Sequence, residues 1–148
     1  MKVDTTPFTH DIIIRVGGYL MVPFIFMWAL YVLIHGALGP GGGFQAGVIM
    51  AAAFIFHATV FGLSATKKVL PVKPLTMIGS IGLLIYAGIG LSALFFGGNY
   101  LEYGVIPFSE HIELCNEYGI EVVEMGIGLT VMAIMTSIFY DLALRGEE

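Results

Sequence analysis

The sequence predicts an all-α integral membrane protein with four transmembrane helices and both termini in the cytoplasm. Of its 148 residues, 57% are hydrophobic and only 11% are charged, whereas a soluble domain carries about a quarter charged residues. Four apolar runs, at about 17–34, 44–63, 75–96 and 122–144, each approach the ~20 residues that a helix needs to cross a ~30 Å hydrocarbon layer. None alternates with the two-residue period of a membrane β-strand. Residues 1–148 are therefore interpreted as one membrane domain.

The basic residues predict the orientation of a multi-pass protein of the plasma membrane. All of them fall on one side of a four-span chain: Lys2, Arg15, Lys67, Lys68, Lys73 and Arg145. Cytoplasmic loops carry an excess of Lys and Arg, so this side is expected to be cytoplasmic. The net charge of −5 comes largely from acidic residues on the opposite side, so it gives no indication of nucleic-acid binding.

The first span, residues 17–34, is predicted to stay in the mature protein. It is longer than the apolar core of a secretory signal, and Asp4 and Asp11 accompany the basic residues in front of it. Pro23 lies within the span and removes one helical hydrogen bond, so a kink is expected there.

A glycine-rich turn, residues 35–47, joins the first two spans. Pro40 fixes its own φ and pushes the preceding residue out of the α region, so the first helix must end before it. Gly41, Gly42 and Gly43 then permit backbone conformations that a side chain would forbid. No Gly-Lys-Ser/Thr sequence follows and no Lys or Arg lies nearby, so a phosphate-binding loop is excluded.

The second span is predicted to pack closely on another helix. From Gly43 the small residues recur at every fourth position, with Gly47 and Ala51, and form one smooth stripe. Phe44 opens this span. His57 lies in its cytoplasmic half and is a candidate proton relay, because the ordinary pKa of histidine is near neutrality. A buried neutral histidine bonded to a carbonyl is the commoner alternative.

The third span, residues 75–96, carries a second stripe of small residues. Its members follow three- and four-residue steps and share one helix face: Gly79, Gly82, Tyr86, Gly90 and Ala93. Such a stripe marks contact with protein rather than with lipid. It is wider than a small four-helix bundle would use, which favours contacts with other subunits.

Residues 97–120 are predicted to form an external loop without a metal site. His111 lies there close to Glu110, Glu113 and Cys115, which are residue types that bind metals. They follow no recognised spacing, and the chain has no second cluster to complete a tetrahedral site. The single cysteine also permits no internal disulfide.

Two carboxylates open the fourth span. Glu121 and Glu124 share a helix face, and no Lys or Arg of the chain falls on their side of the membrane. One interpretation is that they pair with a base of another subunit or border a cation or proton path. The other is that the helix starts near Ile120 and leaves both in the headgroup zone. The headgroup interpretation is preferred for Glu121, and both stay open for Glu124.

The candidate ion-path residues are thus Glu124, His57 and Glu121. The sequence contains no Ser/His/Asp set, no Cys/His pair and no dinucleotide fingerprint. Neither a catalytic site nor a cofactor is therefore predicted.

The glycine-rich turn resembles that of a known membrane family. The segment HGALGPGGGFQAG, residues 35–47, is similar to the first hairpin of the MnhB/MrpB family, one of the subunit types of the Mrp/Mnh multisubunit sodium/proton antiporters. Glu124 followed by Gly126 resembles the opening of that family's last span. The same subunit type also resembles components of archaeal membrane-bound hydrogenase and sulfane reductase complexes. The resemblance implies a small non-redox subunit packed among other membrane subunits of an antiporter or respiratory complex.

The sequence supports two candidate functions. The first is a subunit of a cation/proton-translocating complex, contributing helix packing and part of an ion path. The alternative is a stand-alone four-helix exporter that acts as a homodimer. Such carriers place an essential acid in the first span, and residues 17–34 contain no carboxylate. The sequence leaves open whether the complex is an antiporter, a hydrogenase or a sulfane reductase.

Overall fold

The computed structural model describes residues 12–36, 41–106 and 111–145. In these residues every regular element is a helix. The elements in chain order are α1 (Ile12–Ile34), α2 (Gly43–Phe61), α3 (Leu63–Val69), α4 (Val72–Phe95), the 3₁₀ turn η2 (Tyr103–Val105) and α5 (Ile112–Arg145). Helices α1, α2, α4 and α5 are long and apolar enough to cross a membrane, which confirms the four predicted spans.

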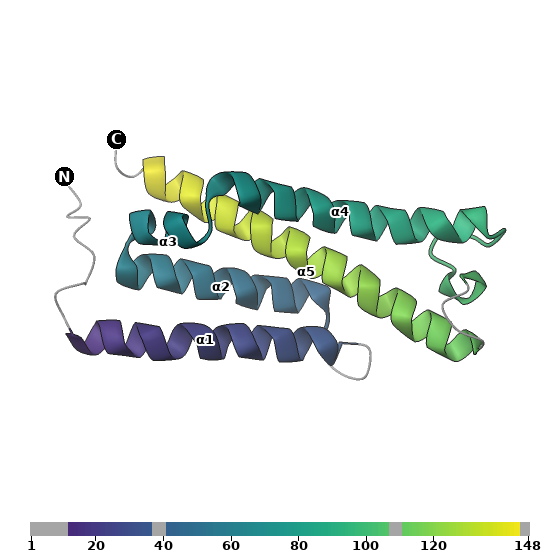
Figure 1. Cartoon of the computed structure of the whole chain (residues 1–148), viewed down its shortest axis with the longest axis horizontal. Helices are drawn as coiled ribbons and strands as arrows, with labels where there is room; N and C mark the ends of the chain where they lie inside the picture. Colours follow the sequence, from purple (N-terminus) through teal and green to yellow (C-terminus); the bar gives the residue numbers. More distant parts are fainter. Residues whose placement is uncertain (1–11, 37–40, 107–110, 146–148) are drawn as a thin grey trace.

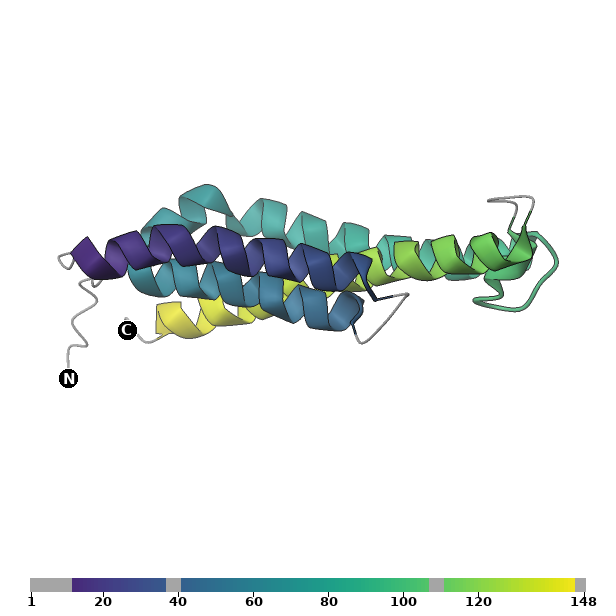
Figure 2. The same ribbon diagram turned by 90° about the horizontal axis from the view of Figure 1, so that it is seen from below.

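Helix α5 is the central helix of the fold. It packs along α2 on one side and along α4 on the other, while α1 packs on α2. Figure 1 shows α5 running diagonally between α2 and α4, and the perpendicular view in Figure 2 shows the four long helices running lengthwise together. The start of α1, the short α3, the start of α4 and the end of α5 share one end of the molecule (Figure 1), which we call the α3 end.

The helix boundaries correct three expectations. Helix α5 begins at Ile112, ten residues before the predicted start of the fourth span, so much of the predicted external loop is helical. Helix α2 ends at Phe61 because Gly62 adopts φ 92°, and the short helix α3 lies between the second long helix and the third. Helix α4 begins at Val72, after Pro71, which serves as its N-cap residue.

Glycines set the close approach of α5 to its two neighbours. A Cβ atom at Gly47 of α2 would lie 2.6 Å from the Gly128 carbonyl oxygen of α5. A Cβ atom at Gly82 of α4 would lie 2.5 Å from the Gly126 carbonyl oxygen. Because no side chain intervenes at either point, the helix backbones meet directly, as small residues allow in membrane interiors.

The stripe on α4 is covered by this chain itself. Gly79 and Gly82 face Ala133 and Thr130 of α5, and Gly90 is covered by the ring of Tyr100. The stripe therefore contacts protein, as predicted, and at these three glycines the protein is this chain itself. Sequence spacing located the stripe and could not reveal that the loop after α4 folds back onto it.

Large apolar side chains cover the outward faces of the two outer helices. Only 11% of the most apolar 18-residue stretch of α1 is buried, and only 22% of the corresponding stretch of α4.

The lysines and arginines of the described segments gather at the α3 end. They belong to elements or helix ends there: Arg15, Lys67, Lys68, Lys73 and Arg145. Lys2 lies outside the described residues.

Candidate functional site: a carboxyl group in the glycine turn

The Glu124 side chain lies inside the turn that joins α1 to α2. A Cβ atom at Gly36 would collide with its Oε2 atom, and one at Gly42 would lie 3.2 Å from Oε1. Gly42 also has φ 135°, which L side chains rarely adopt. Only glycines at these two positions let the turn close around the carboxyl group.

The start of α2 is fixed against the same part of α5. A Cβ atom at Gly43 would collide with the backbone carbonyl oxygen of Glu124. Gly41 is equally confined, since its Cβ atom would lie 2.8 Å from the Val32 carbonyl oxygen at the end of α1. The turn and the carboxylate, two separate features of the sequence, therefore form one structural unit.

Glu124 sits where the short α1–α2 hairpin ends against the longer pair α4–α5. Gly126, two residues further along α5, packs on Gly82 and on the Tyr86 backbone, midway along α4. Glu124 itself lies twelve residues after Ile112, where α5 starts. The premise of the headgroup interpretation, a helix starting near Ile120, is therefore wrong for both Glu121 and Glu124.

The Glu124 carboxyl group has an uncompensated buried oxygen. Its Oε2 atom is buried and accepts no hydrogen bond from any residue that the structure describes. The lysines and arginines of the described segments lie at the α3 end, and the turn lies at the opposite end of α2. His35, the first residue of the turn, is exposed and its ring stacks on Tyr31. Glu121, which is half-buried, stands three residues before Glu124 on the same helix and adds a second acid to this face.

Two further residues were predicted to shape the turn, Pro40 and Phe44. Pro40 lies outside the described residues. The Phe44 ring is 61% exposed and borders a shallow cavity together with Trp28, Val32 and Gln45. Phe44 therefore presents an apolar surface at the edge of the turn.

His57 belongs to a different cluster, at the other end of α2. Its Nδ1 atom lies 2.7 Å from the Thr66 hydroxyl, which donates in turn to the Gly62 carbonyl at 3.1 Å. His57 is fourteen residues after Gly43, about 21 Å along the helix at 1.5 Å per residue. The structure therefore does not bring His57 and Glu124 together.

Several contacts had no clear signal in the sequence. Thr66 is completely buried at the break between α2 and α3, and the Tyr140 hydroxyl donates to the Leu70 carbonyl at 3.2 Å. The Tyr103 ring, in the 3₁₀ turn η2, covers Gly119 near the start of α5. Burial raises the pKa of the Tyr103 phenol above its usual value, and electrostatic interactions with Tyr86 and Tyr100 raise it further. The Tyr140–Leu70 pair joins residues 70 apart in the chain, and Tyr103 and Gly119 belong to different elements, so local spacing does not predict these contacts.

Comparison with known proteins identifies the family. A family model described as a domain related to the MnhB subunit of Na⁺/H⁺ antiporters matches residues 13–137. The chain belongs to the MnhB family. The match includes both the glycine turn and Glu124, so the candidate site lies wholly within the MnhB-related region.

Named antiporter subunits are similar to this MnhB-family chain over most of their length. The B subunit of the Na⁺/H⁺ antiporter of Alkalihalophilus pseudofirmus is 30% identical over 132 residues, which is 84% of this chain and 91% of that protein. The B subunit of the Na⁺/H⁺ antiporter of Bacillus subtilis is 26% identical over 132 residues, or 84% and 92%. These relatives confirm the predicted resemblance to the MnhB-type subunits of the sodium/proton antiporters.

Proposed function

We propose that this chain is a non-redox membrane subunit of a multisubunit Na⁺/H⁺ antiporter, and that Glu124 exchanges a proton or a cation there. The family and the similarity to MnhB-type antiporter subunits support the first part. The observation that carries the second part is the buried Glu124 Oε2 atom, which has no partner among the described residues.

The surroundings of Glu124 favour reversible neutralisation of its charge. An ionised carboxylate in the membrane is costly unless a base, a cation or water accompanies it. No Lys or Arg of the described residues lies at the turn, and the ring of His35, the first residue of the turn, stacks on Tyr31. A proton, a sodium ion or a basic group of another subunit would therefore have to accompany the Glu124 carboxylate. A carboxyl group that exchanges such partners is the element that an ion path requires.

A deletion experiment tests the proposed function. We expect that everted vesicles from cells lacking this gene lose the Na⁺-dependent dissipation of a pH gradient, and that the wild-type gene restores it. The tagged chain should also be recovered with several other membrane subunits. Recovery of a stable homo-oligomer that transports ions by itself would contradict the proposal and favour the alternative exporter.

Mass spectrometry of the same purified assembly identifies the type of complex. An antiporter contains only membrane subunits, whereas a hydrogenase or sulfane reductase complex also contains a peripheral redox arm. We propose the antiporter because both relatives compared above bear that name. A [NiFe]-type or flavin-containing subunit would replace the antiporter by one of the redox complexes.

We also propose that the α3 end faces the cytoplasm, because it gathers the basic residues. In a chain whose native Cys115 is replaced by serine, Asn99→Cys should react with a membrane-impermeant maleimide in intact cells. Lys68→Cys, in α3, should react only after the cells are permeabilised. The reverse labelling pattern would invert the proposed topology.

A further inference from the structure

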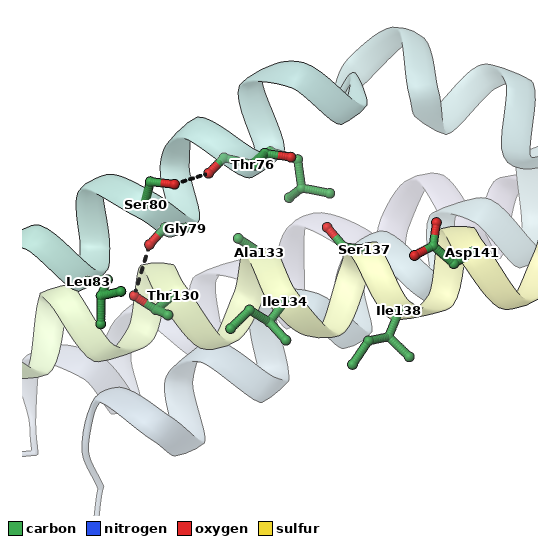
Figure 3. Close-up of a pocket in the computed structure, with 11 residues that line it drawn as sticks. Thr76, Gly79, Ser80, Leu83, Thr130, Ala133, Ile134, Ser137, Ile138 and Asp141 are labelled. Carbon is green, nitrogen blue, oxygen red and sulfur yellow. Dashed lines mark hydrogen bonds between the residues drawn. The ribbon is translucent and has the colours of Figure 1, made fainter.

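A groove lined by both apolar and polar side chains lies between α4 and α5 and extends from the middle of α4 toward the α3 end (Figure 3). It has a volume of about 320 Å³, and its lining includes the polar side chains of Thr76, Ser80, Thr130, Ser137 and Asp141. The Asp141 end of the groove is far from the Glu124 carboxyl group, because Asp141 is seventeen residues further along α5, about 25 Å at 1.5 Å per residue.

Three hydroxyl groups of the groove, those of Thr76, Ser80 and Thr130, donate to their own helices or across to the neighbouring one. Thr76 donates to the Val72 carbonyl at 3.1 Å, and Ser80 donates to the Thr76 carbonyl at 3.0 Å. Thr130 lies 2.9 Å from the Gly126 carbonyl and 3.3 Å from the Gly79 carbonyl. Each of these hydroxyl oxygens keeps a lone pair that can accept a further hydrogen bond.

Two polar groups of α5 have no partner within the described part of the chain. The Ser137 hydroxyl and the Asp141 carboxylate make no hydrogen bond or ion pair with a described residue. Figure 3 shows both directed from α5 toward the side on which α4 lies. Asp141 is exposed, as are Thr76 and Ser80 across the groove.

The groove is flanked by side chains suited to a membrane interior. Leu83, Ile134 and Ile138 line it and are exposed. A run of hydroxyls ending in a carboxylate, framed by such side chains, resembles the small and polar surfaces on which membrane helices associate. Hydrocarbon tails offer these hydroxyls and Asp141 no hydrogen bond, whereas a second helix carrying polar groups does.

We infer that this groove receives a transmembrane helix of a neighbouring subunit, and that this helix places a Lys or Arg side chain against Asp141. The charge of Asp141 selects a basic partner, and the hydroxyl acceptors of the groove select small or hydrogen-donating residues along the rest of that helix. The inference rests on the proposed function, because it requires a complex with other membrane subunits.

Photo-crosslinking in the assembled complex tests the occupant. A benzophenone amino acid replaces Ser80, inside the groove, or Leu84, which is 70% exposed on α4 and does not line the groove. We expect the Ser80 probe to crosslink to one transmembrane segment of another subunit that carries a Lys or Arg near its cytoplasmic end. The Leu84 probe should give a different crosslinking pattern.

Charge reversal tests the role of Asp141. Asp141→Lys should lower the yield of the crosslinked neighbour in the purified complex by about tenfold, since like charges then face each other. Asp141→Asn should have a smaller effect. Glu113→Lys, an equal charge change at an exposed position at the other end of α5, should leave the yield unchanged.

Three outcomes would overturn the inference. They are crosslinks from Ser80 to lipid alone, crosslinks to a second copy of this chain, and full retention of the neighbour in Asp141→Lys. If the chain still co-purifies with other antiporter subunits in these cases, only the docking inference fails. If it co-purifies with none, the proposed function fails.

Discussion

Replacing Glu124 by glutamine is expected to lower the Na⁺/H⁺ antiport rate of the assembled complex by more than about tenfold, as expected for the loss of a functional intramembrane acid. Glutamine keeps nearly the same size, so it still fits between Gly36 and Gly42 of the turn. It cannot take up and release a proton, nor can it neutralise a bound cation. The rate is measured as Na⁺-dependent dissipation of a pH gradient in everted vesicles.

The matched control is Glu113→Gln, on the same helix but at an exposed position near its start. This variant should transport at the wild-type rate. Blue-native electrophoresis should show that both variants assemble into a complex of the same size. Wild-type transport by an assembled Glu124→Gln complex would assign Glu124 a packing role alone.

Gly43→Ala is expected to prevent normal packing of α2 on α5. The added methyl group would collide with the Glu124 carbonyl oxygen, and a main-chain atom cannot rotate away as a side chain can. Overpacking of this kind costs about 1–3 kcal/mol or more. The melting temperature of the detergent-solubilised complex should therefore fall, and less of the protein should be recovered.

Gly17→Ala is the matched control for this substitution. Gly17 lies in α1, and a Cβ atom there would meet nothing within 4 Å. The control variant should retain the wild-type melting temperature and yield. Equal stability of the two variants would show that α2 and α5 do not approach each other as closely as described.

The membrane helices could be predicted because length and apolar composition are local properties of the chain. The glycine-rich turn could also be predicted, since the backbone conformations that it needs follow from a few consecutive residues. The start of α5 was misplaced because residues 97–120 were predicted to form a loop, whereas the last nine of them, from Ile112 onward, are helical. A helix that begins before its apolar segment gives no hydropathy signal at its first residue.

The candidate site was only half predictable. Glu124 stood out as an acid in a span, and the turn stood out by its glycines. Their contact depends on how α5 packs against α2, a tertiary arrangement that one sequence does not specify. The groove beside Asp141 has the same origin, because its hydroxyls come from two helices that lie far apart in the chain.

The glycines around Glu124 restrict which substitutions can alter the space around its carboxyl group, which we call the Glu124 niche. Its walls next to the carboxyl group are peptide backbone, so no nearby side chain at Gly36, Gly42 or Gly43 can be exchanged to adjust its polarity. Any larger residue there intrudes on the niche itself. On the proposed role of Glu124, relatives that prefer different ions would have to differ outside these main-chain walls, and engineering of ion selectivity should begin at those outer positions.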